Sequence, residues 1–462
     1  MNMNNTIGRI QKIKLTNFKN VKHGEIEINK NIDEYFKNES DLIGIYGQNG
    51  SGKSAVVEAM SFIKEIIQGN SLPKNILEYI YKGETYTKLE LIFSIQNSYS
   101  KYELYYDIKI SKEKEKEDKV IISEENIHYK RYNKEKNKWE YKKQLIMFDR
   151  DEEQTFNPKK VFDLLINNKN KVDAKVAKEL SKKQNISYIF SYEMEEIYGA
   201  SEDFKEFKHL ILGLKHFVKY NLFVIKNSTS GIINANIAMP LSFQITKQES
   251  LSGGEFPIFF EPRLLEETNL KMLKKIIDQL NIVMKEIIPN LYIGIKNYGV
   301  ELSDSGEERV KVEIVAKRED IIIPIRYESD GIKKIISFLS VLIGMFNNPT
   351  ICLIVDEFDA NIFEYLLGEL LKIIESDGKG QFIFTSHNLR PLEKLKKESL
   401  RLTTTNPDNR YISFSNIKES NNLRKSYYRM INLGGQDEEI YDETNYYKIA
   451  MAFKILGRKA NE

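Results

Sequence analysis

Hydrophobic and polar positions follow different periods in successive parts of the chain. From Ile10 to Ile28, and again from Leu89 to about Phe148, they mostly alternate, which is typical of strands. Residues 158–220 and 262–288 instead repeat apolar positions every three or four residues, as helices do. From Leu291 onward, strand patterns return and then alternate with helical ones. The pattern therefore predicts an α/β chain with a mostly helical insertion. The predicted units are an N-terminal lobe (1–157), a helical insertion (158–290) and a C-terminal lobe (291–462).

The first strands lead into a glycine-rich loop. Two strands are expected over residues 10–28, with a turn near His23-Gly24. A further strand, 42–46, runs directly into Gly47–Ser54, and residues 55–67 have helical spacing. The local order is therefore strand, glycine loop, helix.

This loop matches the phosphate-binding pattern GxxxxGK[ST] in full. Its glycines allow backbone N–H groups to surround phosphate oxygens, and the following helix N-terminus favours an anion. Lys53 is expected to reach the β- and γ-phosphates, and the Ser54 hydroxyl to bind Mg²⁺. The predicted cofactors are ATP and Mg²⁺. The predicted nucleotide-binding residues here are Gly47, Gln48, Asn49, Gly50, Ser51, Gly52, Lys53, Ser54 and Ala55.

A second motif lies far along the chain, where the apolar run Ile351–Val355 ends in Asp356 and Glu357. A buried strand that ends in two carboxylates is the Walker B pattern. We expect Asp356 to hold Mg²⁺, and Glu357 to orient and deprotonate the attacking water.

Together these motifs resemble the ABC-class ATPase heads of the RecF and SMC families, and smaller ATPases related to the overcoming-lysogenisation-defect (OLD) family. The resemblance covers the first 70 residues, from RIQKIKLTNFKNV through the loop, and about 320–395. It implies an ABC-type P-loop NTPase head, in which a mixed sheet is flanked by helices. Lys53 and Asp356 lie 303 residues apart. A transporter ATP-binding domain has no room for so large an insertion.

The resemblance implies roles for several further residues. His387, in Phe384-Thr385-Ser386-His387, stands where such ATPases place the histidine that contacts the γ-phosphate. Asp359 corresponds to the D-loop at a dimer interface. For the Q-loop glutamine, Gln96 and Gln144 are both possible, and Gln96 is favoured.

The signature motif has two candidates. Leu251-Ser252-Gly253-Gly254-Glu255 matches its letters but lies 105 residues before Asp356. Ser329 and Gly331, in Glu328–Lys334, lie directly before a long apolar helix that leads to the Walker B strand. We favour Ser329, because a signature must open that helix and offer a hydroxyl and N–H groups to a partner subunit's γ-phosphate. Leu251–Glu255 is then interpreted as a plain loop.

Within this group, several segments resemble bacterial abortive-infection and antiphage ATPases, which commonly act with a separately encoded effector. These segments are ESDGIKK, DEFDANIFEYLLGELL, FTSHNLRPLE and NNLRKSYYRMINLGGQDEEIYDET. OLD proteins also carry a C-terminal Toprim nuclease domain. Here about 65 residues follow the switch-histidine region and contain no DxD, and Asp149-Arg150-Asp151 is interpreted as a loop. We therefore predict no nuclease centre.

The amino-acid composition limits the types of site and the cellular location that we expect. The 462 residues are 41% hydrophobic and 29% charged, with one cysteine, Cys352. This excludes a disulfide framework and a cysteine-based zinc site. No apolar run reaches membrane-spanning length and no signal-peptide core is present, so we expect a cytoplasmic protein without a membrane partner.

The predicted function is ATP binding and hydrolysis by a homodimer or higher homo-oligomer whose heads hold ATP between them. A regulatory role beside an effector protein is expected from the resemblance. Two alternatives remain open: a RecF-like DNA-repair ATPase, and an ATP-stabilised scaffold with little turnover. The net charge of +2 neither indicates nor excludes DNA binding. The candidate basic surfaces are Lys142-Lys143, Lys333-Lys334 and Lys396-Lys397.

Overall fold

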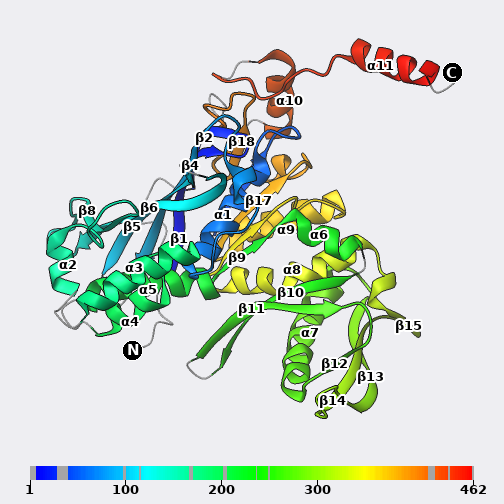
Figure 1. The fold of residues 1–462 in the computed structure, drawn as a ribbon. Helices are drawn as coiled ribbons and strands as arrows, with labels where there is room; N and C mark the ends of the chain where they lie inside the picture. The colour runs from blue at the N-terminus through cyan, green and yellow to red at the C-terminus, as the bar shows by residue number, and fades with distance from the viewer. Residues whose placement is uncertain are drawn as a thin grey trace.

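The computed structural model places two lobes side by side (Figure 1), with an antiparallel sheet in one lobe and a mainly parallel sheet at the centre. It describes residues 7–28, 40–96, 100–113, 116–165, 170–200, 205–235, 237–247, 250–414, 422–434 and 437–459.

The N-terminal sheet has seven strands in the order β2-β1-β4-β5-β6-β7, with β8 paired to β6. Its strands are β1 (Ile7–Phe18), β2 (Val21–Glu27), β4 (Tyr86–Gln96), β5 (Lys101–Glu113), β6 (Lys116–Asn133), β7 (Lys138–Trp139) and β8 (Lys143–Asp149). The turn between β1 and β2 falls at Lys19-Asn20, so the expected turn at His23-Gly24 is wrong. Phe18 and Val21 pair across that turn and are both fully buried, which fixes its position.

Helices from the range 159–220 lie along this sheet (Figure 1). They are α2 (Lys159–Leu165), α3 (Lys171–Gln184), α4 (Tyr192–Ala200) and α5 (Lys205–Tyr220). Aromatic side chains join the layers: Phe93 of β4 meets Phe217 edge to face at 6.3 Å, and Tyr106 of β5 meets Phe190 at 5.5 Å. The helices predicted after residue 158 thus form a layer that packs on the N-terminal sheet.

The central sheet has the order β19-β18-β3-β17-β16-β9. Its strands are β3 (Asp41–Tyr46), β9 (Leu222–Ile225), β16 (Cys352–Val355), β17 (Gln381–Ser386), β18 (Leu400–Thr403) and β19 (Tyr411–Ser413). All neighbours are parallel except β18 and β19. Strand β9 lies inside the range 158–290, so this range is not simply a helical insertion. Its four buried apolar residues pair with β16 and complete the head sheet.

The two faces of the central sheet belong to different cores. Ile43, Ile45 and Ile354 face the core that contains helix α1 (Lys53–Ile67) and the N-terminal sheet. Their neighbours Leu353 and Val355 face the opposite core. That core contains the helices α7 (Glu267–Ile287), α8 (Asp330–Asn347) and α9 (Glu364–Asp377). Because successive residues of a strand face opposite sides, β3 and β16 lie between these two cores.

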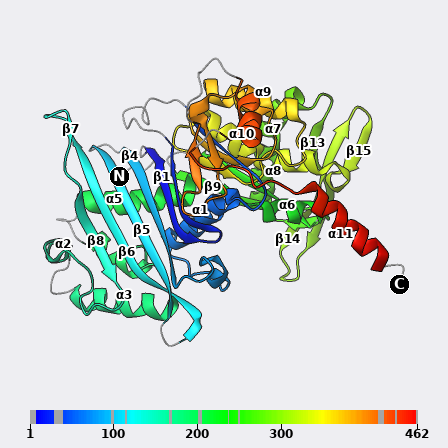
Figure 2. The ribbon, with the colours of Figure 1, turned by 90° about the horizontal axis from the view of Figure 1, so that it is seen from above.

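The second lobe also contains the elements from α6 (Asn227–Asn234) to α8. The hairpin β10 (Ala238–Lys247) and β11 (Ser250–Phe259) precedes a small antiparallel sheet. Its strands are β12 (Arg263–Leu265), β13 (Tyr292–Leu302), β14 (Glu308–Arg318) and β15 (Ile321–Pro324). The chain ends with α10 (Leu423–Leu433) and α11 (Tyr446–Lys459), and α11 stands away from the body in both views (Figures 1 and 2). Among the described residues, no helix combines the length and apolar character needed to span a bilayer.

Candidate nucleotide-binding site

The predicted motifs converge because their strands are parallel neighbours. Val355 of β16 pairs with Phe384 of β17, and Ser386 of β17 pairs with Tyr46 of β3. The residues that follow these strands therefore emerge at one edge of the sheet. In α/β folds, ligands bind at the carboxyl ends of parallel strands.

The loop after β3 has the conformation that its glycines permit. Gly50 and Gly52 have φ values of 75° and 96°, in the left-handed region that disfavours other residues. Helix α1 then begins at Lys53. Residues from β18 and β19 support the loop from behind: Thr403 Oγ1 lies 2.5 Å from Ser51 Oγ, and the Tyr411 hydroxyl donates to Gly52 O at 2.8 Å.

Lys53 lies within this loop and is 6% exposed. Its Nζ donates to the carbonyl oxygens of Gly47 and Gln48, each at 2.9 Å. Burial lowers the pKa of Lys53 to about 8, although the nearby carboxylates of Asp356 and Glu357 oppose that shift. The lysine and the Walker B acids are therefore electrostatic neighbours.

Asp356 is the centre of a short hydrogen-bond network. Its Oδ1 accepts from the Ser54 hydroxyl at 3.1 Å and from the Thr385 hydroxyl at 2.6 Å. A hydroxyl and a carboxylate at this separation suit Mg²⁺, which binds few protein oxygens and completes its shell with water and phosphate oxygens. The donor set that the sequence predicts for the metal, Ser54 and Asp356, is therefore brought together.

Glu357 follows in an uncommon conformation. Its φ is 47°, and its N–H donates to Thr385 Oγ1 at 2.8 Å. Its carbonyl oxygen accepts from Lys334 Nζ of α8. A non-glycine residue at positive φ is uncommon and needs its surroundings to hold it there. Here two side chains, from β17 and α8, hold the peptide of Glu357 on both sides.

Asp359 and His387 also meet. Asp359 Oδ2 accepts from the backbone N–H groups of His387 at 3.1 Å and Asn388 at 2.9 Å. The pKa of His387 is lowered, first by desolvation and then by the charge of Lys53. A neutral imidazole near the phosphate site can donate one hydrogen bond and accept another.

Ser329 lies elsewhere, at the exposed N-terminal end of α8. It caps that helix, accepting from Ile332 N–H at 3.4 Å. Gly331 follows in the first turn, where an added Cβ would lie only 2.0 Å from the carbonyl oxygen of Asn361. The start of α8 therefore packs directly on the segment that carries Asp359.

The other signature candidate has a different setting. Residues 251–255 lie within strand β11, where Ser252 pairs with Ile245 of β10. They form neither the start of a helix nor the expected plain loop, because the chain folds back into a hairpin.

The structure also places Gln96 far from the loop. Gln96 ends β4 and pairs with Ile7 at the start of β1, whereas the loop lies near the other end of β1. The 12 residues of β1 separate the two ends by about 36 Å at 3.3 Å per residue. Gln144, on β8, pairs with β6 farther out in the same sheet. The assignment of Gln96 to the nucleotide site is therefore wrong, since the sequence pattern gave a strand end without its direction.

Sequence reasoning missed three residues that shape the site: Thr385, Thr403 and Lys334. Thr385 could have been predicted from sequence. It lies near the end of the strand beside the Walker B strand, where a hydroxyl faces the Walker B carboxylates. Thr403 and Lys334 could not, because their places depend on the packing of β18 and α8.

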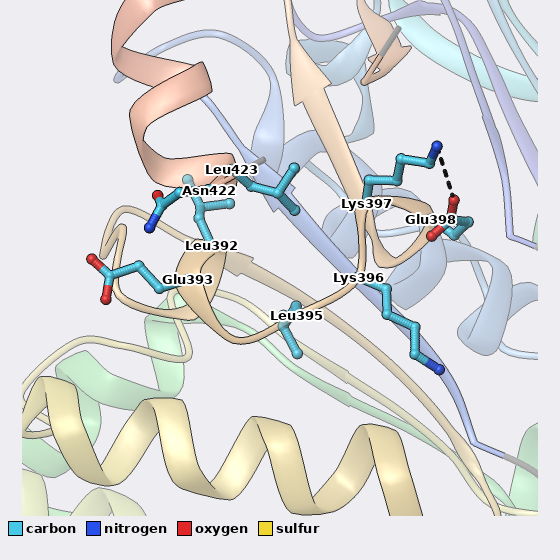
Figure 3. Close-up of a pocket in the computed structure, with 8 residues that line it drawn as sticks. All are labelled: Leu392, Glu393, Leu395, Lys396, Lys397, Glu398, Asn422 and Leu423. Carbon is cyan, nitrogen blue, oxygen red and sulfur yellow. Dashed lines mark ion pairs between the residues drawn. The ribbon is translucent and has the colours of Figure 1, made fainter. Parts of the chain in front are cut away.

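The candidate basic surfaces do not form a shared patch. Lys333 and Lys334 are buried, at 2% and 4% exposure. Lys143 pairs with Glu140 at 2.7 Å. Lys396 and Lys397 line a hollow of about 400 Å³ beside α10, together with Glu393 and Glu398 (Figure 3). Acidic side chains thus accompany the exposed lysines.

A mainly parallel central sheet, a P-loop after β3 and two carboxylates after β16, with β17 between these two strands, define an ABC-type P-loop NTPase head. The chain belongs to the RecF/RecN/SMC N-terminal domain family, whose model matches residues 9–409. Proteins of this family bind and hydrolyse ATP, generally with Mg²⁺, which supports ATPase activity for this chain.

Solved structures similar to the chain include three SMC heads. The SmcHead bound to the C-winged helix domain of ScpA is 14% identical, with 88% of this chain and 98% of that chain covered and a TM-score of 0.44. The Smc head domain with an extended coiled coil bound to the C-terminal domain of ScpA, derived from Pyrococcus furiosus, is 13% identical (92% and 99% covered, TM-score 0.42). The SMC head domain from Thermotoga maritima is 13% identical (88% and 99% covered, TM-score 0.37). No curated protein matches the chain.

Proposed function

We propose that this chain is an ATP-switched ABC-class ATPase, in which ATP is held between the heads of a homodimer or a higher homo-oligomer. One observation carries the proposal. Ser54 and Asp356 are 302 residues apart in sequence, yet they share a hydrogen bond at 3.1 Å beside the buried Lys53. This is the arrangement that binds a nucleoside triphosphate with a divalent cation.

The hydrolytic step uses the residues around that pair. The loop N–H groups and Lys53 would bind the β- and γ-phosphates, and Ser54 and Asp356 would hold Mg²⁺, which would supply positive charge to neutralise the phosphates. Glu357 orients a water for in-line attack and accepts its proton, and His387 contacts the γ-phosphate. Catalysis is then mainly positioning and charge stabilisation.

The position of Ser329 supports a site completed by a second copy. Ser329 is exposed at the surface, where it caps the N-terminus of α8. A helix N-terminus attracts an anion, and the γ-phosphate on a facing head has the required charge. We therefore assign Ser329 and Gly331 to the partner's nucleotide, with Asp359 near the same interface.

The proposed biological role is that of a regulator in bacterial antiphage defence, acting with a separately encoded effector. The segments that resemble abortive-infection ATPases support this role, among them ESDGIKK and FTSHNLRPLE. A phage-plating assay with the chain and its neighbouring genes tests it. Protection that disappears with Glu357→Gln supports the role, whereas equal plaque counts with and without the genes contradict it.

The first biochemical test compares wild type and Glu357→Gln by light scattering and phosphate release, with and without ATP and Mg²⁺. We expect ATP to shift Glu357→Gln from monomer to oligomer while turnover falls at least 100-fold, since the general base is lost. A variant that stays monomeric and hydrolyses ATP at the wild-type rate would overturn the proposal. One fixed oligomer regardless of ATP would indicate a scaffold instead.

A further inference from the structure

A buried lysine links the helix that begins at Ser329 to the peptide of Glu357. Lys334 lies in the second turn of α8 and is 4% exposed. Its Nζ donates to the carbonyl oxygen of Glu357. Asp356, Glu357 and Asp359 all act on it electrostatically. The ammonium group is therefore buried against the backbone of the catalytic segment.

The contact holds a residue that needs support. Glu357 has a φ of 47°, and its backbone is held by Thr385 at the N–H and by Lys334 at the carbonyl. Side-chain direction depends on backbone conformation, so a change at this carbonyl redirects the Glu357 carboxylate. Thr385 fixes the peptide to β17, whereas Lys334 fixes it to α8.

Burying an ammonium group costs stability unless the group is paired. A methionine of similar length would fill the same space without that cost. The presence of a lysine here is therefore better explained by its contact with Glu357 than by packing.

We propose that Lys334 is the positioning residue for Glu357, and that it makes α8 and the catalytic carboxylate move as one unit. When Ser329 at the start of α8 engages a facing nucleotide, the displacement reaches Glu357 through two rigid connections. One is the Lys334 hydrogen bond, and the other is the close contact between Gly331 and Asn361. Hydrolysis is thereby coupled to assembly. This inference rests on the proposed function.

The test uses Lys334→Met and Lys334→Arg in the full chain, with ATP affinity, turnover and ATP-dependent oligomer formation as readouts. We expect Lys334→Met to bind ATP within about threefold of wild type and to assemble with ATP, because it touches neither the loop nor Ser329. Its kcat should fall roughly 10- to 100-fold, as for other residues that orient a catalytic group. Lys334→Arg retains a donor and should recover part of the rate.

A second buried lysine provides the matched control. Lys178 of α3 is also 4% exposed, and its Nζ donates to the carbonyls of Asp149, Glu152 and Gln154 in the N-terminal lobe. Lys178→Met should lower the melting temperature and leave kcat unchanged. Lys334→Met should lower kcat and change the melting temperature less, because it removes the donor from one carbonyl rather than three.

Two results would overturn the inference while the proposed function stands. One is a wild-type kcat in Lys334→Met. The other is a parallel loss of melting temperature, ATP affinity and kcat that Lys334→Arg does not relieve, which would show a structural role. The double variant with Glu357→Gln gives a further check, because residues that act as one unit are not additive. We expect it to be no slower than Glu357→Gln alone. A wild-type protein that does not hydrolyse ATP at all contradicts the proposed function itself.

Discussion

Asp356 Oδ1 accepts one hydrogen bond from Ser54 at 3.1 Å and another from Thr385 at 2.6 Å. The first donor is the last residue of the P-loop motif, and the second lies near the end of the neighbouring strand, β17. Thr385 also accepts the N–H of Glu357, so one hydroxyl orients both Walker B residues. The metal site is thus fixed by the register between β16 and β17.

Thr385→Val should therefore lower the apparent affinity for Mg²⁺ in ATP hydrolysis. Valine has nearly the same shape but neither donates to Asp356 nor accepts from Glu357. Loss of such an outer contact typically costs 10- to 100-fold in metal affinity or activity. We expect the half-saturating Mg²⁺ concentration for ATP hydrolysis to rise by about that factor. Thr87→Val is the control, because Thr87 is equally buried but bonds Thr16 O in the N-terminal sheet. An unchanged Mg²⁺ dependence in Thr385→Val would contradict this role.

Ser329→Asp should block ATP-dependent assembly without unfolding α8. Aspartate still caps the helix, so the helix N-terminus keeps its acceptor. Its charge repels a γ-phosphate on a facing head, whereas Ser329→Asn caps equally well and carries no charge. Light scattering in the Glu357→Gln background, with ATP and Mg²⁺, measures the effect. Ser252→Asp in the β10–β11 hairpin should leave assembly intact. If Ser252→Asp blocks it and Ser329→Asp does not, the signature assignment is wrong.

Gly331→Ala tests the contact between α8 and the segment after Glu357. The added Cβ would meet the Asn361 carbonyl oxygen at 2.0 Å, and backbone atoms give way only with local movement. Overpacking of this kind costs about 1–3 kcal/mol of unfolding free energy. We expect that loss in a denaturation curve, together with slower ATP turnover. Gly231→Ala in α6 has open space around its Cβ and should be neutral or slightly stabilising. Equal stability of both variants would contradict the close packing.

The local motifs could be predicted from sequence, but long-range directions could not. The order strand, P-loop, helix depends on neighbouring residues, and β3, Gly47–Gly52 and α1 follow one another as expected. Helix α8 also begins next to Ser329. The assignment of Gln96 was wrong because the antiparallel pairing of β4 with β1 decides which end of the sheet Gln96 occupies, and β1 is distant in sequence. Strand β9 was missed because four apolar residues between helices show no period of their own. Lys334 was interpreted as exposed because nothing in a Lys-Lys pair reveals a buried contact with Glu357.

The N-terminal lobe provides a prediction that is independent of nucleotide chemistry. Glu125 of β6 is fully buried and accepts hydrogen bonds from the hydroxyls of Tyr106 at 2.8 Å and Ser187 at 2.5 Å, and from Ile189 N–H at 3.2 Å. Glu125→Ala leaves these donors unpaired, which should cost about 2–4 kcal/mol of unfolding free energy. Glu124→Ala is the neighbouring control. Its side chain is 38% exposed and ion-paired with Lys109, so it should cost at most about 1 kcal/mol.

The same residue should make stability depend on pH. Burial raises the pKa of Glu125 above its ordinary value of 4.5, although its hydrogen bonds with Ser187 and Tyr106 oppose the shift. Between pH 4.5 and that raised pKa, the folded protein holds a proton that the unfolded chain has released. The contribution of Glu125 to the unfolding free energy is therefore full below pH 4.5 and is lost as pH rises through the folded-state pKa. Denaturant titrations of wild type and Glu125→Ala across this window should show their difference shrinking as pH rises. A difference that stays constant or grows would show that Glu125 is ionised in the folded lobe.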